Sequence, residues 1–330
     1  MFKSSVPAVP AKTTSVRVDS SVVLKIVKHV YEHYPVQVCG QLLGFEELED
    51  TKELNISYSF PFPSIANDTE GNASVRSKGM IKYQNDMIDH LKEVNVDANP
   101  TGWYVSGNMG RFFNQAVIEN MLSYQNTNPE SVMLVHDVSK SAQSGFSLKA
   151  YRLSPAYLAV RKEGKFTTDN LTKNELSYHT IFEELPVKVS NSHLVTLYLQ
   201  SIEHKPDYDH LNISIDSYLE KNIEGIFDSV DDFHYDQGNY NYYQRQMSRE
   251  KLKIQQWQQK RKAENNARQQ QGKQPLSTEE WKSLFKLPDE PSRVENLLIS
   301  GQIDQYCNQI EEFGSSITPK LFAAQKNLEA

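Results

Sequence analysis

Two histidines one helical turn apart are the first side chains in this sequence whose spacing could support chemistry. His29 and His33 enclose Glu32 in the segment His-Val-Tyr-Glu-His. Residues four positions apart share a face of a helix, so both imidazoles could bind one zinc ion while Glu32 takes a proton from a zinc-bound water. A zinc-dependent hydrolase is therefore one hypothesis.

The residues around this segment favour a structural interpretation. Val23, Val27 and Val30 recur at the spacing of an apolar helix stripe, and the two histidines lie beside that stripe. Matches to a five-residue pattern also arise often by chance. We therefore expect the solvated edge of an amphipathic helix here rather than a metal site.

A second candidate is His136-Asp137, which ends an apolar segment over residues 131–136. A histidine in this position could act as a general base. The sequence contains no Gly-x-Ser-x-Gly nucleophile motif, no Gly-x-Gly-x-x-Gly and no phosphate-binding Gly-Lys-Ser/Thr loop. We therefore expect a structural histidine, and nucleotide chemistry has no support.

Alternating and helical apolar patterns predict the elements that must position these residues. Their interleaving up to about residue 190 indicates an α/β domain. The predicted strands cover 16–18, 38–43, 54–62, 101–106, 131–136, 146–152, 157–162 and 186–189, and the predicted helices lie over 20–34, 81–91 and 111–124.

Beyond residue 190 the strand patterns end and helical periodicity takes over. Residues 203–236 hold ten Asp and Glu against two Lys, whereas residues 245–273 hold nine Lys and Arg against two Glu, among many glutamines. We predict helices near 194–202 and 215–233, a basic Gln-rich helix over 243–273, and C-terminal helices over 292–328.

The basic helix 243–273 has two interpretations. Its clustered Lys and Arg could contact RNA phosphates, although over 245–273 Trp257 is the only aromatic side chain for stacking on bases. Alternatively, it is a solvated helix that packs through Leu252, Ile254 and Trp257 in a larger assembly. We favour packing and keep non-specific RNA contact as the alternative.

The C-terminal helices carry an apolar face that their own small region cannot cover. Such a face needs partner helices, from this chain or from another subunit, and we favour another subunit. The predicted interaction residues are Leu297, Leu298, Ile303, Tyr306, Ile310 and Phe313.

Composition limits the remaining classes of protein. The chain has 330 residues and a formal net charge of -7, and no segment approaches the roughly 18 apolar residues of a membrane helix. Residues 1–15 resemble a disordered tail rather than a secretion signal. Cys39 and Cys307 are far apart, so we expect reduced thiols and a cytoplasmic protein that does not bind membranes.

The strongest resemblance lies at Gly102-Trp103-Tyr104-Val105-Ser106-Gly107. This strand resembles the Gly-Trp-Tyr-His-Ser-His of MPN/JAMM zinc isopeptidases. In catalytic members of that family the two histidines and an aspartate bind zinc, a glutamate accepts a proton and a serine supports the oxyanion. The resemblance implies a JAMM-like fold with a mixed, curved sheet flanked by helices.

All five catalytic positions differ in this chain. The base position holds Gln37, the histidine positions hold Val105 and Gly107, the serine position holds Gln115 and the aspartate position holds Ile118. Neither a valine, a glycine nor an isoleucine side chain can bind a metal. The resemblance therefore implies no zinc, no cofactor and no enzymatic activity.

Further segments resemble the MPN subunits of eukaryotic translation initiation factor 3. The resemblance implies a catalytically degenerate MPN domain over 16–190 and a helical assembly region over 191–330. It also implies a scaffold that pairs with the second MPN subunit of that factor (its F subunit), joins a helical bundle and acts on the small ribosomal subunit. Alternatives are a non-catalytic MPN subunit of the proteasome lid or signalosome, or an isopeptidase. The segments are 22–29, 60–63, 102–104, 122–125, 147–153, 191–194, 283–286 and 297–303.

Overall fold

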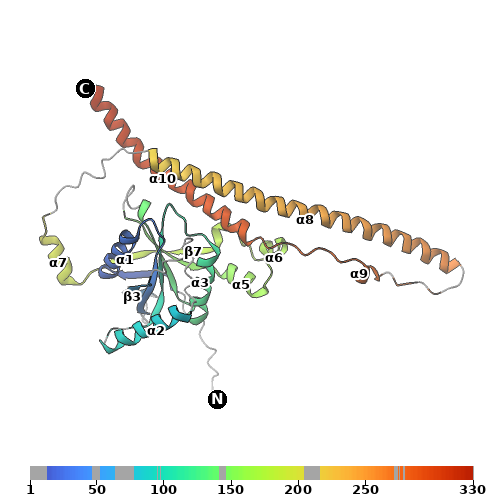
Figure 1. The fold of residues 1–330 in the computed structure, drawn as a ribbon, viewed down its shortest axis with the longest axis horizontal. Coiled ribbons are helices and arrows are strands. Elements are labelled where there is room, and N and C mark those ends of the chain that lie inside the picture. The colour runs from blue at the N-terminus through green and yellow to red at the C-terminus, as the bar shows by residue number, and fades with distance from the viewer. Residues whose placement is uncertain are drawn as a thin grey trace, which may run out of the picture.

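A mixed sheet of eight strands forms the centre of the N-terminal half in the computed structural model (Figure 1). The strand order is β7-β6-β5-β4-β2-β3-β1-β8. The strands are β1 Ser15–Asp19, β2 Cys39–Glu46, β3 Glu53–Pro61, β4 Pro100–Gly107, β5 Val132–Asp137, β6 Leu148–Leu153, β7 Phe182–Leu185 and β8 Val187–Ser190. The structure describes residues 13–46, 53–63, 78–94, 96, 98–140, 146–203, 216–270, 274, 276–277 and 279–329.

The sheet mixes parallel and antiparallel pairs. Strand β1 runs parallel to β3 and β8, and β4 runs parallel to β5. Strand β2 is antiparallel to both of its neighbours, and the register of each pairing shifts near Leu43. Such irregularities bend a strand. The predicted α/β domain with a mixed sheet, followed by a helical region, is confirmed.

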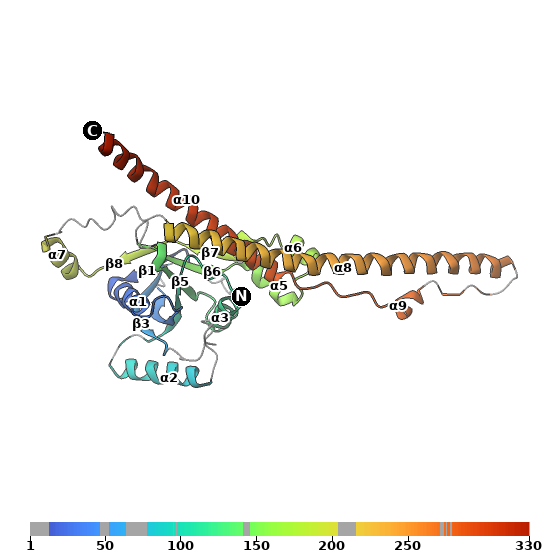
Figure 2. The same ribbon diagram turned by 45° about the horizontal axis from the view of Figure 1, so that its top comes forward.

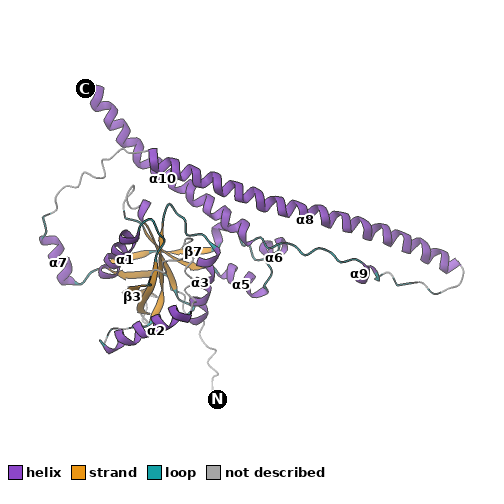
Figure 3. Ribbon diagram, in the orientation of Figure 1, coloured by secondary structure: helices purple, strands orange, loops and turns teal. Residues whose placement is uncertain are grey.

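Helices cover both faces of this sheet because its strands alternate apolar side chains (Figure 3). In β4, Tyr104 faces α1 (Ser20–His33), whereas Trp103 and Val105 face α3 (Gln115–Thr127). Helix α2 (Lys78–Glu93) packs through Met80 onto Phe60 and Phe62 of the β3 end. The last residue of β4, Gly107, thus lies at the edge of the α3 layer.

One predicted strand is wrong. Residues 157–162 lie in helix α5 (Pro155–Glu163). The Ser154 hydroxyl accepts a hydrogen bond from the Tyr157 amide at 3.1 Å, and Gly164 ends the helix in the left-handed region at φ 73°. These start and stop signals outweigh a short apolar run. Strand β7, which the sequence analysis did not predict, follows the short elements α6 (Thr168–Lys173) and a 3₁₀ turn (Tyr178–Thr180).

The C-terminal half is helical, and its central helix is longer than predicted. Two helices were expected over 215–233 and 243–273, but α8 (Asp216–Gln270) is continuous over 55 residues. No proline interrupts it, and a glycine such as Gly238 costs a helix only about 1 kcal/mol. The acidic and basic stretches therefore belong to one rod. The other helices are α7 (His193–Ser201), α9 (Trp281–Leu284) and α10 (Val294–Glu329).

Helices α8 and α10 lie side by side over the half of α8 nearest the sheet, and the far half of α8 extends away from the domain (Figures 1 and 2). None of the helices in the described ranges is long and apolar enough to cross a membrane. The predicted tail over 1–15 lies outside the described residues up to residue 12. Within that range, the Thr13 amide donates to Glu130 at 2.8 Å and Ser15 begins β1.

Candidate functional site

Apolar side chains surround two of the positions that, by the resemblance, correspond to zinc ligands of the isopeptidases. Val105 and Ile118 are 2% and 1% exposed and belong to one apolar cluster between β4 and α3. Gly107 lies two residues beyond Val105, on the same face of the strand. A Cβ placed on Gly107 would be 3.6 Å from the nearest atoms, so no close contact requires glycine here. One histidine position and the aspartate position therefore belong to a packed core, whereas the other histidine position, Gly107, lies beside Val135 and the Asp137 side chain.

The base position lies across from the same end of β4. Cys39 pairs with Val105, so Gln37 two residues earlier lies level with Gly107. The pairing is extended by Val38, whose amide donates to the Ser106 hydroxyl at 2.8 Å. A carboxamide cannot accept the proton of a metal-bound water. Burial also raises the pKa of the Cys39 thiol to about 12, so at neutral pH almost none of it is the thiolate nucleophile.

The serine position of the family, Gln115, lies outside this core. Gln115 is exposed at the start of α3 and donates from Nε2 to Glu119 Oε1 at 3.0 Å. Asn114 begins the helix here, because its side chain accepts a hydrogen bond from the Val117 amide at 2.9 Å. The structure thus brings Val105 and Ile118 together and places Gln37 level with Gly107, while Gln115 points to solvent.

The His29 segment lacks the geometry of a zinc site. His29 Nδ1 is 2.9 Å from the Tyr104 hydroxyl, and His33 Nδ1 donates to the His29 carbonyl at 3.0 Å. Glu32 faces Lys28 at 3.7 Å. Burial, followed by the nearby His33, lowers the pKa of His29. In the described ranges, no three His, Cys, Asp or Glu side chains are grouped so that they could hold a metal ion.

His136 is buried and held by the backbone. Its Nδ1 donates to the Ser147 carbonyl at 2.8 Å, and its ring lies 5.4 Å from the Phe146 ring. Burial lowers the pKa of His136, which keeps the ring neutral at physiological pH. This geometry agrees with the structural role expected from the sequence.

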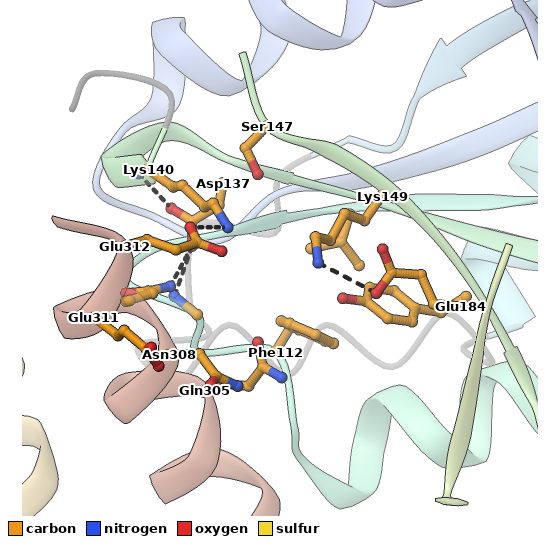
Figure 4. Close-up of a pocket in the computed structure, with 14 residues that line it drawn as sticks. Phe112, Asp137, Lys140, Ser147, Lys149, Glu184, Gln305, Asn308, Glu311 and Glu312 are labelled. Carbon is orange, nitrogen blue, oxygen red and sulfur yellow. Dashed lines mark hydrogen bonds and ion pairs between the residues drawn. The ribbon is translucent and has the colours of Figure 1, made fainter. Parts of the chain in front are cut away.

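Asp137 is the residue whose role sequence reasoning missed. Its Oδ2 accepts hydrogen bonds from the Gly110 amide at 2.6 Å and from Gln309 Nε2 at 3.1 Å, and its Oδ1 accepts one from the Lys140 amide at 3.2 Å (Figure 4). Three donors stabilise a carboxylate strongly. Gln309 belongs to α10, so Asp137 joins the end of β5 to the C-terminal helix rather than activating a substrate.

A cavity of about 280 Å³ lies between this carboxylate, the β6–β7 edge and α10 (Figure 4). Charges of opposite sign are paired along its walls. Lys140 forms an ion pair with Glu312, and Lys149 forms one with Glu184 at 3.2 Å. The carboxylates of Asp137 and Glu311 also line the cavity, so acidic groups outnumber the two lysines along this polar boundary between the sheet and α10.

Three of the six predicted interaction residues are covered by their own chain. Leu298, Tyr306 and Phe313 are 6%, 1% and 4% exposed. The Tyr306 ring lies against Gly225 of α8, and the Phe313 ring is 5.0 Å from the Tyr218 ring. The helix that we expected from another subunit is supplied here by α8 and the sheet domain. A partner contact through these three side chains is therefore corrected to an internal one.

The other three predicted interaction residues, Leu297, Ile303 and Ile310, are only partly buried. In the basic stretch, Ile254 is buried within the chain while Leu252 is 56% exposed. Ile254 therefore packs inside the chain, Trp257 is partly buried, and packing of Leu252 in a larger assembly stays a prediction.

Residues 11–130 match the family model described as JAB1/Mov34/MPN/PAD-1 ubiquitin protease, and residues 141–329 match the model for the C-terminal region of eIF3h. The second match covers more than half of the chain. It includes α8 and α10, the elements that close over the sheet domain.

Curated relatives match the chain over almost its whole length. The H subunit of eukaryotic translation initiation factor 3 from Yarrowia lipolytica is 53% identical over 347 residues, which cover 96% of this chain and 99% of that protein. The proteins of the same name from Neurospora crassa and Aspergillus terreus are each 43% identical and also cover 96% of this chain, with 97% and 96% of their own lengths. The chain therefore belongs to the family formed by the H subunits of eukaryotic translation initiation factor 3.

Proposed function

We propose that this protein is a non-catalytic scaffold subunit of translation initiation factor 3 that acts in the cytoplasm on the small ribosomal subunit. The observation that carries the proposal is the apolar contact of Val105 with Ile118, which fills the zinc position with hydrocarbon. A hydrolase of this family needs three ligands and an open water position there. Neither can exist in a packed core.

The scaffold role is supported by apolar surface that the chain leaves uncovered. Helix α7 exposes Leu194 and Tyr198, and the end of α10 exposes Leu321 and Phe322. Together with the partly buried Leu297, Ile303 and Ile310, these side chains offer helix faces for a bundle. The MPN domain is proposed to pair with the second MPN protein of the factor, its F subunit, as the family resemblance implies.

A contact with RNA through the basic stretch, residues 243–273, is the remaining part of the proposal. Residues 271–273 of this stretch lie outside the described residues. The proposed RNA contact is supported by the excess of Lys and Arg on a helix that extends away from the sheet domain (Figure 2).

Co-purification followed by mass spectrometry tests the scaffold role directly. The tagged full-length protein is expected to recover the other subunits of translation initiation factor 3, including the F subunit. Recovery of proteasome-lid or signalosome subunits instead would assign the chain to another complex. Zinc at one equivalent per chain in a chelator-treated sample, together with cleavage of a ubiquitin conjugate, would contradict the non-catalytic role.

A further inference from the structure

Four basic side chains form a stripe along the outer half of α8. Arg245, Arg249, Lys253 and Lys260 are all exposed. At 3.6 residues per turn they fall within about 80° of one another around the helix axis and span about 22 Å along it. We call these four residues the basic face of α8.

The opposite side of α8 packs against other residues of the same chain. Ile254 is buried there, Arg261 forms an ion pair with Glu280, and the Asn265 carboxamide exchanges two hydrogen bonds with the Leu276 backbone at 2.8 and 3.0 Å. These contacts fix the rotation of α8 about its axis. The basic face is therefore held toward solvent.

The basic face makes few ion pairs within the described part of the molecule. In the described ranges Arg245, Arg249 and Lys260 form no ion pair, and Lys253 has one partner, Glu250, at 2.7 Å while remaining 59% exposed. Four like charges on one side of a rod repel each other, so a polyanion that bridges them gains energy and releases its counterions.

The neighbouring side chains indicate which kind of polyanion fits. A protein partner would need an apolar or aromatic centre. Between Arg245 and Lys260 the only other residue within the stripe is Gln256, and Leu252 lies at its margin. The exposed Tyr242 lies on the same side of the helix, but about one turn before the stripe begins, at its end rather than its centre. Single-stranded RNA binds through aromatic stacking. Trp257 is the only aromatic residue over 245–270. It lies about 40° beyond Lys253 around the helix, and Arg261 Cζ covers its ring at 4.7 Å from the ring centre. The phosphate backbone of a duplex needs neither.

We propose that the basic face of α8 binds the phosphate backbone of double-helical RNA, by charge and shape and without reading sequence. This inference rests on the proposed function and specifies its RNA contact. The net charge of -7 does not oppose it, because ions screen charges beyond about 8 Å at physiological salt. The basic half of α8 also extends away from the sheet domain (Figure 1), which leaves room for a duplex beside it.

Two pairs of substitutions that remove the same charge test the assignment. Lys253→Gln with Lys260→Gln removes half of the basic face. Lys251→Gln with Lys262→Gln removes two exposed lysines from roughly the opposite side of the same helix. The affinity of the full-length chain for an RNA duplex of about 20 base pairs is measured by fluorescence anisotropy at several salt concentrations.

The first pair is expected to weaken duplex binding on the order of tenfold and to lower the log–log salt slope by about 2. The second pair is expected to change affinity by less than about twofold, since its lysines do not face the duplex. Circular dichroism checks that both variants keep α8 helical.

Equal losses from both pairs would overturn the inference, because net charge alone would then explain binding. Tighter binding to a single strand of the same length would overturn it too. Loss of a partner protein in the first pair only, with no duplex binding by the wild type, would assign the face to an acidic protein. Failure of the wild type to co-purify with the initiation factor would instead contradict the proposed function itself.

Discussion

Arg111 donates from Nε to the Tyr306 hydroxyl at 2.5 Å, across 195 positions of sequence. Arg111 lies in the loop that follows β4, and Tyr306 is buried at the centre of α10. This bond raises the pKa of Arg111. The loop beside the degenerate zinc position is therefore a docking point for the C-terminal helix, and Gly225 of α8 closes the other side of the same ring.

Gly225→Ala is expected to loosen the α8–α10 pair. A Cβ at this position would lie 2.7 Å from Cζ of Tyr306, and the ring is held by Arg111 and cannot easily give way. Gly238→Ala is the matched control, because nothing lies within 4 Å of its Cβ position and alanine favours a helix by up to about 1 kcal/mol. Hydrogen exchange should show faster exchange in α10 for the first variant only. Equal protection of α10 in both variants would contradict the assigned contact.

Restoring one catalytic residue is expected to unfold the domain rather than bind zinc. Ile118→Asp places a carboxylate where the side chain is 1% exposed among hydrocarbon, at a cost of several kcal/mol. Gln115→Ser, at the exposed fifth position, should change stability by no more than about 0.5 kcal/mol. Thermal unfolding with and without zinc measures both. Stabilisation of Ile118→Asp by zinc would show that a metal site survives.

Stability is expected to fall as pH drops below about 6.5, the ordinary pKa of histidine. Burial lowers the pKa of His29 and of His136 in the folded protein, so the unfolded chain binds more protons in this range. The stability that depends on neutral histidine is fully present above this pH and is lost as pH falls through the folded pKa.

His136→Gln should reduce that pH dependence, whereas His234→Gln, at an exposed position, should leave it unchanged. Urea unfolding at several pH values between about 5 and 8 measures the difference. An identical pH profile for wild type and His136→Gln would contradict the role assigned to burial.

The two thiols are expected to react at very different rates with iodoacetamide near pH 8. Because only the thiolate is nucleophilic, the pKa of about 12 makes Cys39 unreactive in the folded chain, whereas Cys307 is exposed. Mass spectrometry of the native and the urea-unfolded protein compares the labelling. Labelling of native Cys39 as fast as Cys307 would contradict its placement in the core.

Most strands and helices of the sheet domain were predictable from the sequence, because apolar alternation and turn residues determine secondary structure through local interactions. The strands around Val105 and His136 follow their patterns closely. Residues 157–162 show where this reasoning fails, since a short apolar run fits a strand or a helix equally well. Ser154 and Gly164 decide that case, and both signals were already present in the sequence.

The sequence by itself determined that three positions of the family's metal site carry no ligand. Valine at 105, glycine at 107 and isoleucine at 118 cannot bind zinc in any conformation, because their side chains have no donor atom. Only the tertiary structure decided what covers the C-terminal apolar face. Tyr306 and Phe313 present the same pattern whether their partner is α8 or another subunit, because hydrophobic burial is non-directional. The choice between these partners depends on whether the segment between α8 and α10 brings α10 back against α8. A local sequence pattern carries no information about that long-range contact.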